Sequence, residues 1–196
     1  NEFSLFFTII CFLLIINALN MFDGINLQVG LFCLVVFTFF YFNNFSILFS
    51  LIMIVSLVTF LILNYNSKCF LGDSGCYLLA FLIAVIIIHY YNLQLYIDNG
   101  NKEINADHIF ILLMLPGIDM LRLFVYRVAN GKNPFEGDNH HIHHLFVSRY
   151  GLNKSNLIIQ SIVILPLILM QIFPSLVIIL ISLLTYSYLI YFMYLR

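Results

Sequence analysis

The chain gathers most of its histidines in one short polar segment near residue 140. Residues 134–144 read PFEGDNHHIHH and contain four of the six histidines. Imidazole can bind a metal ion, hold a phosphate group or exchange a proton near neutral pH. Three interpretations stay open from these residues: an anion site in which the histidines act with Arg127 and Lys132, a metal site, or a structural loop. The HIHH spacing at residues 141–144 does not favour three tetrahedral ligands from one segment.

A second polar segment, residues 64–75, ends in Gly-Asp-Ser-Gly directly before an apolar stretch. Gly72 and Gly75 would let the backbone approach a ligand closely, and the carboxylate of Asp73 can hold a hard cation through its oxygens. Aspartate also caps helices by accepting hydrogen bonds from their first amide groups. Asp73 is therefore interpreted as either a metal ligand or a helix cap.

A third group of polar side chains recurs at every third position near the start of the chain. These residues are Asn17, Asn20 and Asp23. On a helix they form a stripe down one face. Polar groups in or near a membrane are costly and usually face a cavity or a partner, which makes Asp23 a functional candidate. In the alternative, the asparagines bond neighbouring helices and Asp23 with Gly24 ends the helix.

The rest of the chain consists largely of apolar stretches that must position these groups. It is 63% hydrophobic and only 9% charged, whereas soluble domains carry about 25% charged residues. Seven stretches approach the roughly 17–25 residues of a spanning helix. They cover residues 3–19, 27–42, 45–63, 76–91, 108–128, 157–173 and 176–195. Since such runs do not alternate like barrel strands, we expect an all-α polytopic transmembrane bundle of about seven spans, with a break or kink at Pro116-Gly117.

Seven spans place the three polar segments on one side of the membrane, in loops 20–26, 64–75 and 129–154. Seven of the eight Lys and Arg residues fall on that side when the helix ends are counted with their loops, and only Lys102 falls on the other. The positive-inside rule identifies the basic side as cytoplasmic. We therefore expect one site that faces the cytoplasm and receives a water-soluble substrate.

Together, the three motifs resemble those of the bacterial polyprenyl-phosphate N-acetylhexosamine-1-phosphate transferases. The family pattern Asn-Ala-x-Asn-x-x-Asp-Gly-x-Asp-Gly is similar to residues 17–27. The pattern Asn-x-x-Pro-Ala-Lys-x-Phe-Met-Gly-Asp-x-Gly-Ser is similar to residues 64–76, and Ser-Pro-Phe-x-x-Asp-x-x-His-Ile-His-His to residues 133–144. The similarity extends over nearly the whole chain.

The chain departs from the family patterns at several positions. Asn26 replaces the second aspartate of the first motif, Leu27 its glycine and Cys76 a serine, and a single Ser67 stands where Pro-Ala is usual. The family also has an Asp-Asp-rich loop upstream of the three motifs. We therefore expect residues 1–196 to form a single membrane-embedded transferase domain that lacks its N-terminal spans and is inactive alone.

The resemblance implies transfer of a sugar 1-phosphate from a UDP-N-acetylhexosamine to undecaprenyl phosphate, with release of UMP. It implies a multi-pass protein of the bacterial inner membrane with a cytoplasmic active site, no nucleic-acid partner, and compatibility with a homodimer. Mg²⁺, or Mn²⁺ in its place, would neutralise the diphosphate. Asp23 and Asp73 are the implied catalytic residues, and Asp73 is the implied metal ligand. The implied substrate-binding residues are Asn17, Asn20, Asn64, Arg127, His141, His143 and His144.

Two other functions use the same residues. A divalent-metal transporter with a cytoplasmic histidine loop would employ the imidazoles and Asp73, but it predicts ionisable side chains midway across several spans. The charged residues of this chain lie instead at the span ends. A noncatalytic relative of the transferases would be consistent with Asn26 and with the absence of the Asp-Asp-rich loop.

Overall fold

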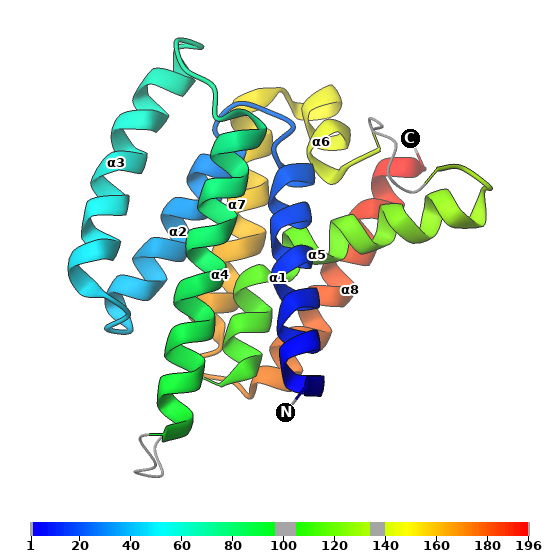
Figure 1. Cartoon of the computed structure of the whole chain (residues 1–196). Coiled ribbons are helices and arrows are strands. Elements are labelled where there is room, and N and C mark those ends of the chain that lie inside the picture. Colours follow the sequence, from blue (N-terminus) through cyan, green and yellow to red (C-terminus); the bar gives the residue numbers. More distant parts are fainter. Residues whose placement is uncertain (1, 97–104, 134–139, 196) are drawn as a thin grey trace. The chain divides into compact units, whose positions relative to one another are not determined.

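All regular secondary structure in the described part of the chain is α-helical (Figure 1). The structure is a computed structural model that describes residues 2–96, 105–133 and 140–195. These ranges contain eight helices and no strand, which confirms the predicted all-α class. The helices are α1 (Glu2–Phe22), α2 (Gln28–Phe42), α3 (Ile47–Tyr65), α4 (Gly72–Tyr96), α5 (Ala106–Ala129), α6 (Ile142–Tyr150), α7 (Leu152–Leu169) and α8 (Ser175–Tyr194).

Most of these helices have the length and composition of membrane spans. In the described residues, six of them (α1, α3, α4, α5, α7 and α8) are long and apolar enough to cross a membrane, and α2 is a shorter apolar helix. Large apolar side chains such as Leu48 and Leu184 remain exposed on them, as expected where lipid is the solvent. The chain is a multi-pass membrane protein, and the prediction of about seven spans is confirmed.

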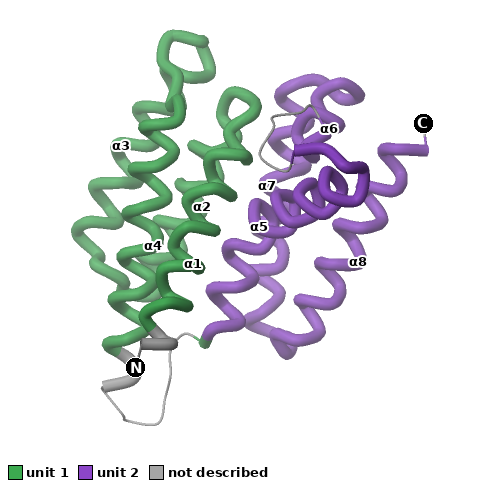
Figure 2. The backbone as a smooth tube through the Cα atoms, turned by 45° about the vertical axis from the view of Figure 1, so that its right-hand side comes forward, with its two compact units in different colours: residues 1–105 green, residues 106–196 purple. Residues whose placement is uncertain are grey.

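The chain folds as two compact units (Figure 2). Unit 1 covers residues 1–105 and contains α1 to α4, and unit 2 covers residues 106–196 and contains α5 to α8. In unit 1, α2 packs along α3 and α1 packs along α4. In unit 2, α7 packs against α5, α6 and α8. The unit 1 motifs and the histidine segment therefore belong to different units.

Helix α2 forms the packing centre of unit 1, because it contacts α1, α3 and α4. Its buried apolar side chains recur every three or four residues, which places them on one face of the helix. They are Val29, Phe32, Cys33, Val36, Phe37 and Phe40. Gly30 lies where α2 approaches α3, and a Cβ atom there would come within 2.8 Å of a Leu61 methyl group. The missing side chain lets the two helices approach closely beside the first motif.

Unit 2 differs from the sequence prediction in the histidine segment. We expected a loop at 129–154, but residues 142–150 form helix α6. His141 precedes α6 without a side-chain cap of its own, and the Ile142 amide instead donates to Asp119 of α5 at 3.3 Å from each carboxylate oxygen. Because this cap comes from a residue far away in the sequence, no local sequence pattern predicts the start of the helix. Pro134, Phe135 and Asp138 of the predicted motif lie outside the described residues.

Helix α5 contains Pro116 in its interior, and Figure 1 shows α5 changing direction along its length. Proline removes one backbone hydrogen bond and its ring clashes with the preceding turn, which bends a helix. The predicted kink is therefore confirmed, although the helix continues through it to Ala129. Asp119, Arg122 and Arg127 lie in the part of α5 that follows the proline.

Candidate functional site

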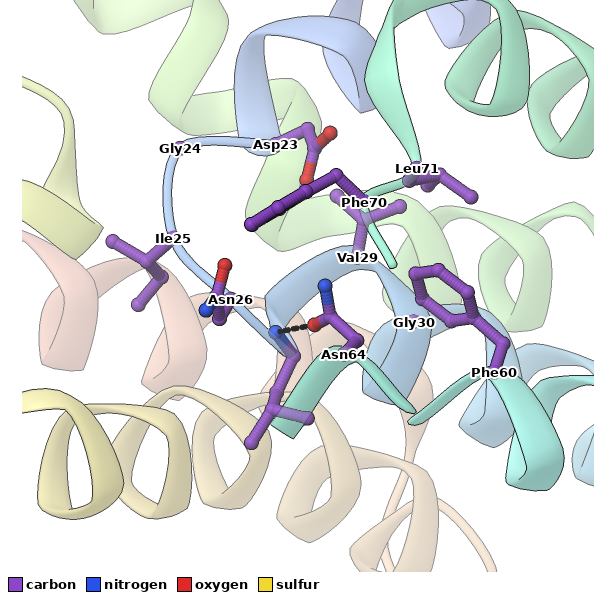
Figure 3. Close-up of a pocket in the computed structure, with 11 residues that line it drawn as sticks. Asp23, Gly24, Ile25, Asn26, Val29, Gly30, Phe60, Asn64, Phe70 and Leu71 are labelled. Carbon is purple, nitrogen blue, oxygen red and sulfur yellow. Dashed lines mark hydrogen bonds between the residues drawn. The ribbon is translucent and has the colours of Figure 1, made fainter. Parts of the chain in front are cut away.

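The first two motifs meet at a pocket in unit 1 (Figure 3). The pocket has a volume of about 190 Å³ and lies where the segment between α1 and α2 meets the segment between α3 and α4. It combines polar side chains of both motifs with two aromatic rings. Its lining includes Asp23, Asn26, Asn64, Phe60 and Phe70. The pocket thus offers a carboxylate and amides to the polar groups of a ligand, and aromatic faces to a ring of the ligand.

Asp23 is a half-buried carboxylate directly after α1. Its Oδ2 accepts a hydrogen bond from the Cys76 thiol at 3.1 Å. Burial raises the pKa of Asp23, the Cys76 hydrogen bond lowers it, and the negative charge of Asp73 raises it further. The two carboxylates are therefore close enough to repel each other, although they are fifty positions apart. A cation near both would remove this repulsion.

Asp73 lies exposed in the first turn of α4. A carboxylate at this end of a helix interacts favourably with the helix dipole. Gly72 directly before it has a φ of +63° and no neighbour that a Cβ would meet within 4 Å. Access to Asp73 from outside the protein is thus unobstructed, as a metal ligand requires.

The side chain of Asn64 connects the two motifs. Its Oδ1 accepts from the Leu27 amide at 2.6 Å (Figure 3), and its Nδ2 donates to the Cys69 carbonyl at 2.7 Å. Asn26 adds a second link by donating to the Ser67 hydroxyl at 3.1 Å. Asn64 therefore positions the walls of the pocket, and its predicted contact with substrate stays a prediction.

Leu27 occupies a backbone conformation that favours glycine. It precedes α2 with a φ of 74° and a ψ of −23°, in the left-handed region, and the resembling family has glycine at this position. An L side chain in this conformation costs roughly 1–2 kcal/mol. The departure from the family pattern thus carries an energetic cost in the backbone.

We expect Leu27→Gly to be more stable than Leu27→Ala by about 1 kcal/mol, because only glycine relieves the left-handed strain. Both variants lose the same leucine contacts, so their difference isolates the backbone effect. Thermal unfolding in detergent micelles measures it. At the helical control position Leu31 the order should reverse, since Gly is less favourable than Ala inside a helix. Equal stabilities at position 27 would contradict this account.

Two of the three asparagines of the first motif, Asn17 and Asn20, lie in α1 and differ in their contacts. Asn17 donates to the Leu13 carbonyl of its own helix at 2.8 Å. Asn20 donates to the Tyr77 hydroxyl of α4 at 3.4 Å. The Asn20 Oδ1 is buried and has no hydrogen-bond partner among the described residues. Asn20 is therefore directed toward α4, whereas the hydrogen bond described for Asn17 stays within its own helix.

In unit 2, the histidine segment is anchored on Asp119 of α5. The His141 Nδ1 lies 2.9 Å from Asp119 Oδ2, and because a carboxylate only accepts, Nδ1 carries the proton. Arg122, one helical turn after Asp119, forms an ion pair with it at 2.9 Å. Tyr186 of α8 also donates to Asp119 at 2.8 Å. Tyr186 lies outside the three sequence motifs, in a largely apolar span.

The histidine rings are packed together. The rings of His141 and His143 stack with centroids 5.2 Å apart and an interplanar angle of 6°, and His144 approaches His143 at 4.3 Å. Burial, and then the neighbouring His144 and His141, lower the pKa of His143 to about 3, against an opposing effect of the Asp119 charge. His143 is therefore neutral at physiological pH. It would meet an anion as a hydrogen-bond donor, since the ring carries no positive charge.

Arg127 completes the unit 2 candidates. It lies in the last turn of α5 and is 2% exposed. Together with His141, His143 and His144, it forms the unit 2 group, whereas Asn20, Asp23, Asn64 and Asp73 form the unit 1 group.

Cys76 and Asp119 were not among the predicted site residues, although each forms a hydrogen bond with one of them. The family serine at position 76 was a signal that a hydrogen-bond donor belongs beside Asp23.

Known proteins resemble the chain in both units. Residues 2–91 match the profile of glycosyl transferase family 4. The undecaprenyl-phosphate alpha-N-acetylglucosaminyl 1-phosphate transferase of Haemophilus influenzae is 33% identical over 111 residues, which cover 54% of this chain and 29% of that protein. The protein of the same name from Thermotoga maritima is 30% identical over 162 residues, 79% of this chain and 47% of that protein.

The Yersinia pestis protein of that name is 30% identical over 144 residues, 67% of this chain and 38% of its own length. The chain thus spans less than half the length of these three relatives. No solved structure matches it. The profile match covers the first two motifs, and their residues form one pocket in unit 1. The chain belongs to glycosyl transferase family 4.

Proposed function

We propose that the protein transfers a sugar 1-phosphate from a UDP-N-acetylhexosamine to undecaprenyl phosphate and releases UMP. The observation that carries this proposal is the pair of interacting carboxylates, Asp23 in the pocket and the exposed Asp73. The names of the relatives support the same acceptor lipid. Two interacting carboxylates, of which Asp23 lines the pocket, suit a reaction between phosphate anions that requires a cation.

The proposed reaction exchanges one phosphorus–oxygen bond for another. An oxygen of the lipid phosphate forms a bond to the phosphorus that carries the sugar. The bond from this phosphorus to the bridging oxygen breaks, and UMP leaves with that oxygen. Because both reactants are anions, positioning and charge neutralisation supply most of the catalysis.

Mg²⁺, or Mn²⁺ in its place, would neutralise the diphosphate charge when bound. The residues of unit 1 fit such an ion, because Asp73 is exposed, Asp23 carries a repelling charge beside it, and Mg²⁺ prefers carboxylate oxygens. We assign Asp73 as the metal ligand. Asp23, with Asn17 and Asn20, orients the nucleotide sugar or the lipid phosphate.

The unit 2 candidates supply hydrogen-bond donors for phosphate oxygens. Arg127 and the rings of His141, His143 and His144 are assigned this role, which suits guanidinium and imidazole N–H groups. We place the site at the cytoplasmic face of the bacterial inner membrane, since seven of the eight basic residues lie on that side of the predicted topology. A water-soluble UDP-sugar is available on that side.

The function is tested with membranes that contain the protein at its full natural length. Radiolabelled UDP-sugars are added with undecaprenyl phosphate, with Mg²⁺ or with a chelator, and labelled lipid is separated by thin-layer chromatography. We expect a labelled lipid diphosphate-sugar with at least one UDP-N-acetylhexosamine, and its loss in the chelator. Absence of labelled lipid with every donor would favour the noncatalytic relative, and metal uptake by vesicles would favour the transporter.

The Cys76 hydrogen bond predicts a change in the pH profile of transfer. This bond lowers the pKa of Asp23 against the larger effect of burial, so Cys76→Ala should raise that pKa further. If Asp23 acts as a carboxylate, the loss of activity on acidification then begins at a higher pH in Cys76→Ala than in the wild type. Cys76→Ser keeps a donor and serves as the matched control. Superimposable profiles for the alanine variant and the wild type would argue against an ionised Asp23.

A further inference from the structure

Asp119 is a buried carboxylate for which the proposed reaction has no use. It is 1% exposed, one turn beyond Pro116 in α5. A buried charge is costly unless it is paired and fully hydrogen-bonded. A carboxylate buried in an apolar span therefore needs specific partners, and these partners indicate its role.

The hydrogen bonds of Asp119 with the described residues link it to the histidine segment and to two further side chains. Oδ2 accepts from the His141 ring at 2.9 Å, and both oxygens accept from the Ile142 amide at 3.3 Å. Oδ1 accepts from Arg122 at 2.9 Å and from the Tyr186 hydroxyl at 2.8 Å. The carboxylate thus fixes both the His141 ring and the backbone that follows it.

Arg122 strengthens this arrangement. Its Nη2 also donates to the His140 carbonyl at 2.7 Å, and its Nε donates to the Tyr186 hydroxyl at 2.8 Å. The ion pair therefore holds the residues on both sides of His141 through their backbone groups. Such a fully satisfied network allows few alternative positions for the ring.

The alternative role for these groups is to bind a metal ion. Ligand atoms of Asp119, His141 and His143 all lie within 4.8 Å of one another. The Arg122 guanidinium, however, lies 2.9 Å from the same carboxylate, and its positive charge repels a second cation. Tyr186 occupies Oδ1 as well. The network therefore favours a carboxylate that orients a histidine.

We propose that Asp119 is a positioning residue that holds His141 with Nδ1 protonated, so that Nε2 is the ring atom presented to the phosphate groups. This inference rests on the proposed function for its catalytic consequence. Asp119 itself does not touch the substrate. It acts through His141, because a carboxylate on Nδ1–H sets both the tautomer and the ring orientation.

Asp119→Asn tests the inference with little change of shape. The asparagine amide has one accepting oxygen, and the charged Arg122 donates to it. The NH₂ group of the asparagine therefore faces His141. Because this group only donates, the His141 Nδ1 must accept and the ring proton moves to Nε2. We expect kcat to fall roughly 10- to 100-fold with a much smaller change in KM for the UDP-sugar. In a His141→Gln background the same substitution should cost nothing further. Ser182→Ala, a buried polar change in α8 outside the network, should keep the wild-type rate.

The tautomer is read independently of activity from ¹⁵N spectra of histidine-labelled protein, with His141→Gln to assign the signal. We expect protonated Nδ1 in the wild type and protonated Nε2 in Asp119→Asn. An unchanged tautomer, an unchanged kcat, or equal losses in the presence and absence of His141 would each overturn the inference. If the wild type makes no labelled lipid, the proposed function fails, and the spectra still decide whether Asp119 sets the tautomer.

Discussion

Asp73→Asn will reduce lipid-linked product formation by roughly 10²–10³-fold while the protein stays folded. The carboxylate is exposed in the first turn of α4, so the substitution leaves no cavity. Asparagine keeps the shape and removes the negative charge on which a bound Mg²⁺ depends. We therefore expect the residual activity to require a higher Mg²⁺ concentration than the wild type.

The chain offers a matched control for Asp73. Asp107 is also an exposed aspartate in the first turn of an apolar helix, α5. Both substitutions remove the same favourable interaction with a helix dipole, worth roughly 0.3–1 kcal/mol. Asp107→Asn should retain the wild-type rate. If Asp73→Asn kept more than half of the wild-type activity at every Mg²⁺ concentration, the assignment of Asp73 as a metal ligand would be wrong.

Asp119→Ala will produce the largest loss of stability. Removing one partner of a buried ion pair costs about 3–5 kcal/mol, because the remaining charge is left uncompensated. The Arg122 side chain is 18% exposed and can reach some water, so we expect the lower part of this range. Thermal unfolding in micelles should show a fall in Tm of roughly 6–12 °C.

A double variant separates the lost charge pair from the lost packing. Asp119→Leu combined with Arg122→Met replaces both charges by apolar groups of similar size, and such replacements are often neutral. We expect this double variant to be more stable than Asp119→Ala alone. A double variant as unstable as the single one would show that the ion pair itself contributes the stability.

The sequence predicted the features that depend on local composition. The membrane helices follow from long uncharged runs, since no other structure satisfies the backbone in lipid. The kink in α5 follows from the chemistry of Pro116. The approach of the first two motifs in unit 1 follows from the family resemblance, and residues of both line one pocket.

The features that the sequence did not predict depend on contacts between distant positions. Helix α6 begins with histidines, which are poor caps, and its cap is Asp119, 23 positions from Ile142. Tyr186 joins the same carboxylate from 67 positions away. Nothing in the sequence pattern of this span distinguishes the Tyr186 hydroxyl from those of the other tyrosines in α8.

The two hydrogen bonds of the Asn64 side chain, here called the Asn64 bridge, link formation of the pocket to the folding of unit 1. These bonds join the start of α2 to the end of α3 and the segment beyond it. These helices are neighbours in the chain, so closing them as a hairpin requires little loop entropy. The bridge can form only when that hairpin has closed. The pocket and the α2–α3 hairpin should therefore open and close as one cooperative element, with exchange of the Leu27 amide hydrogen as its reporter.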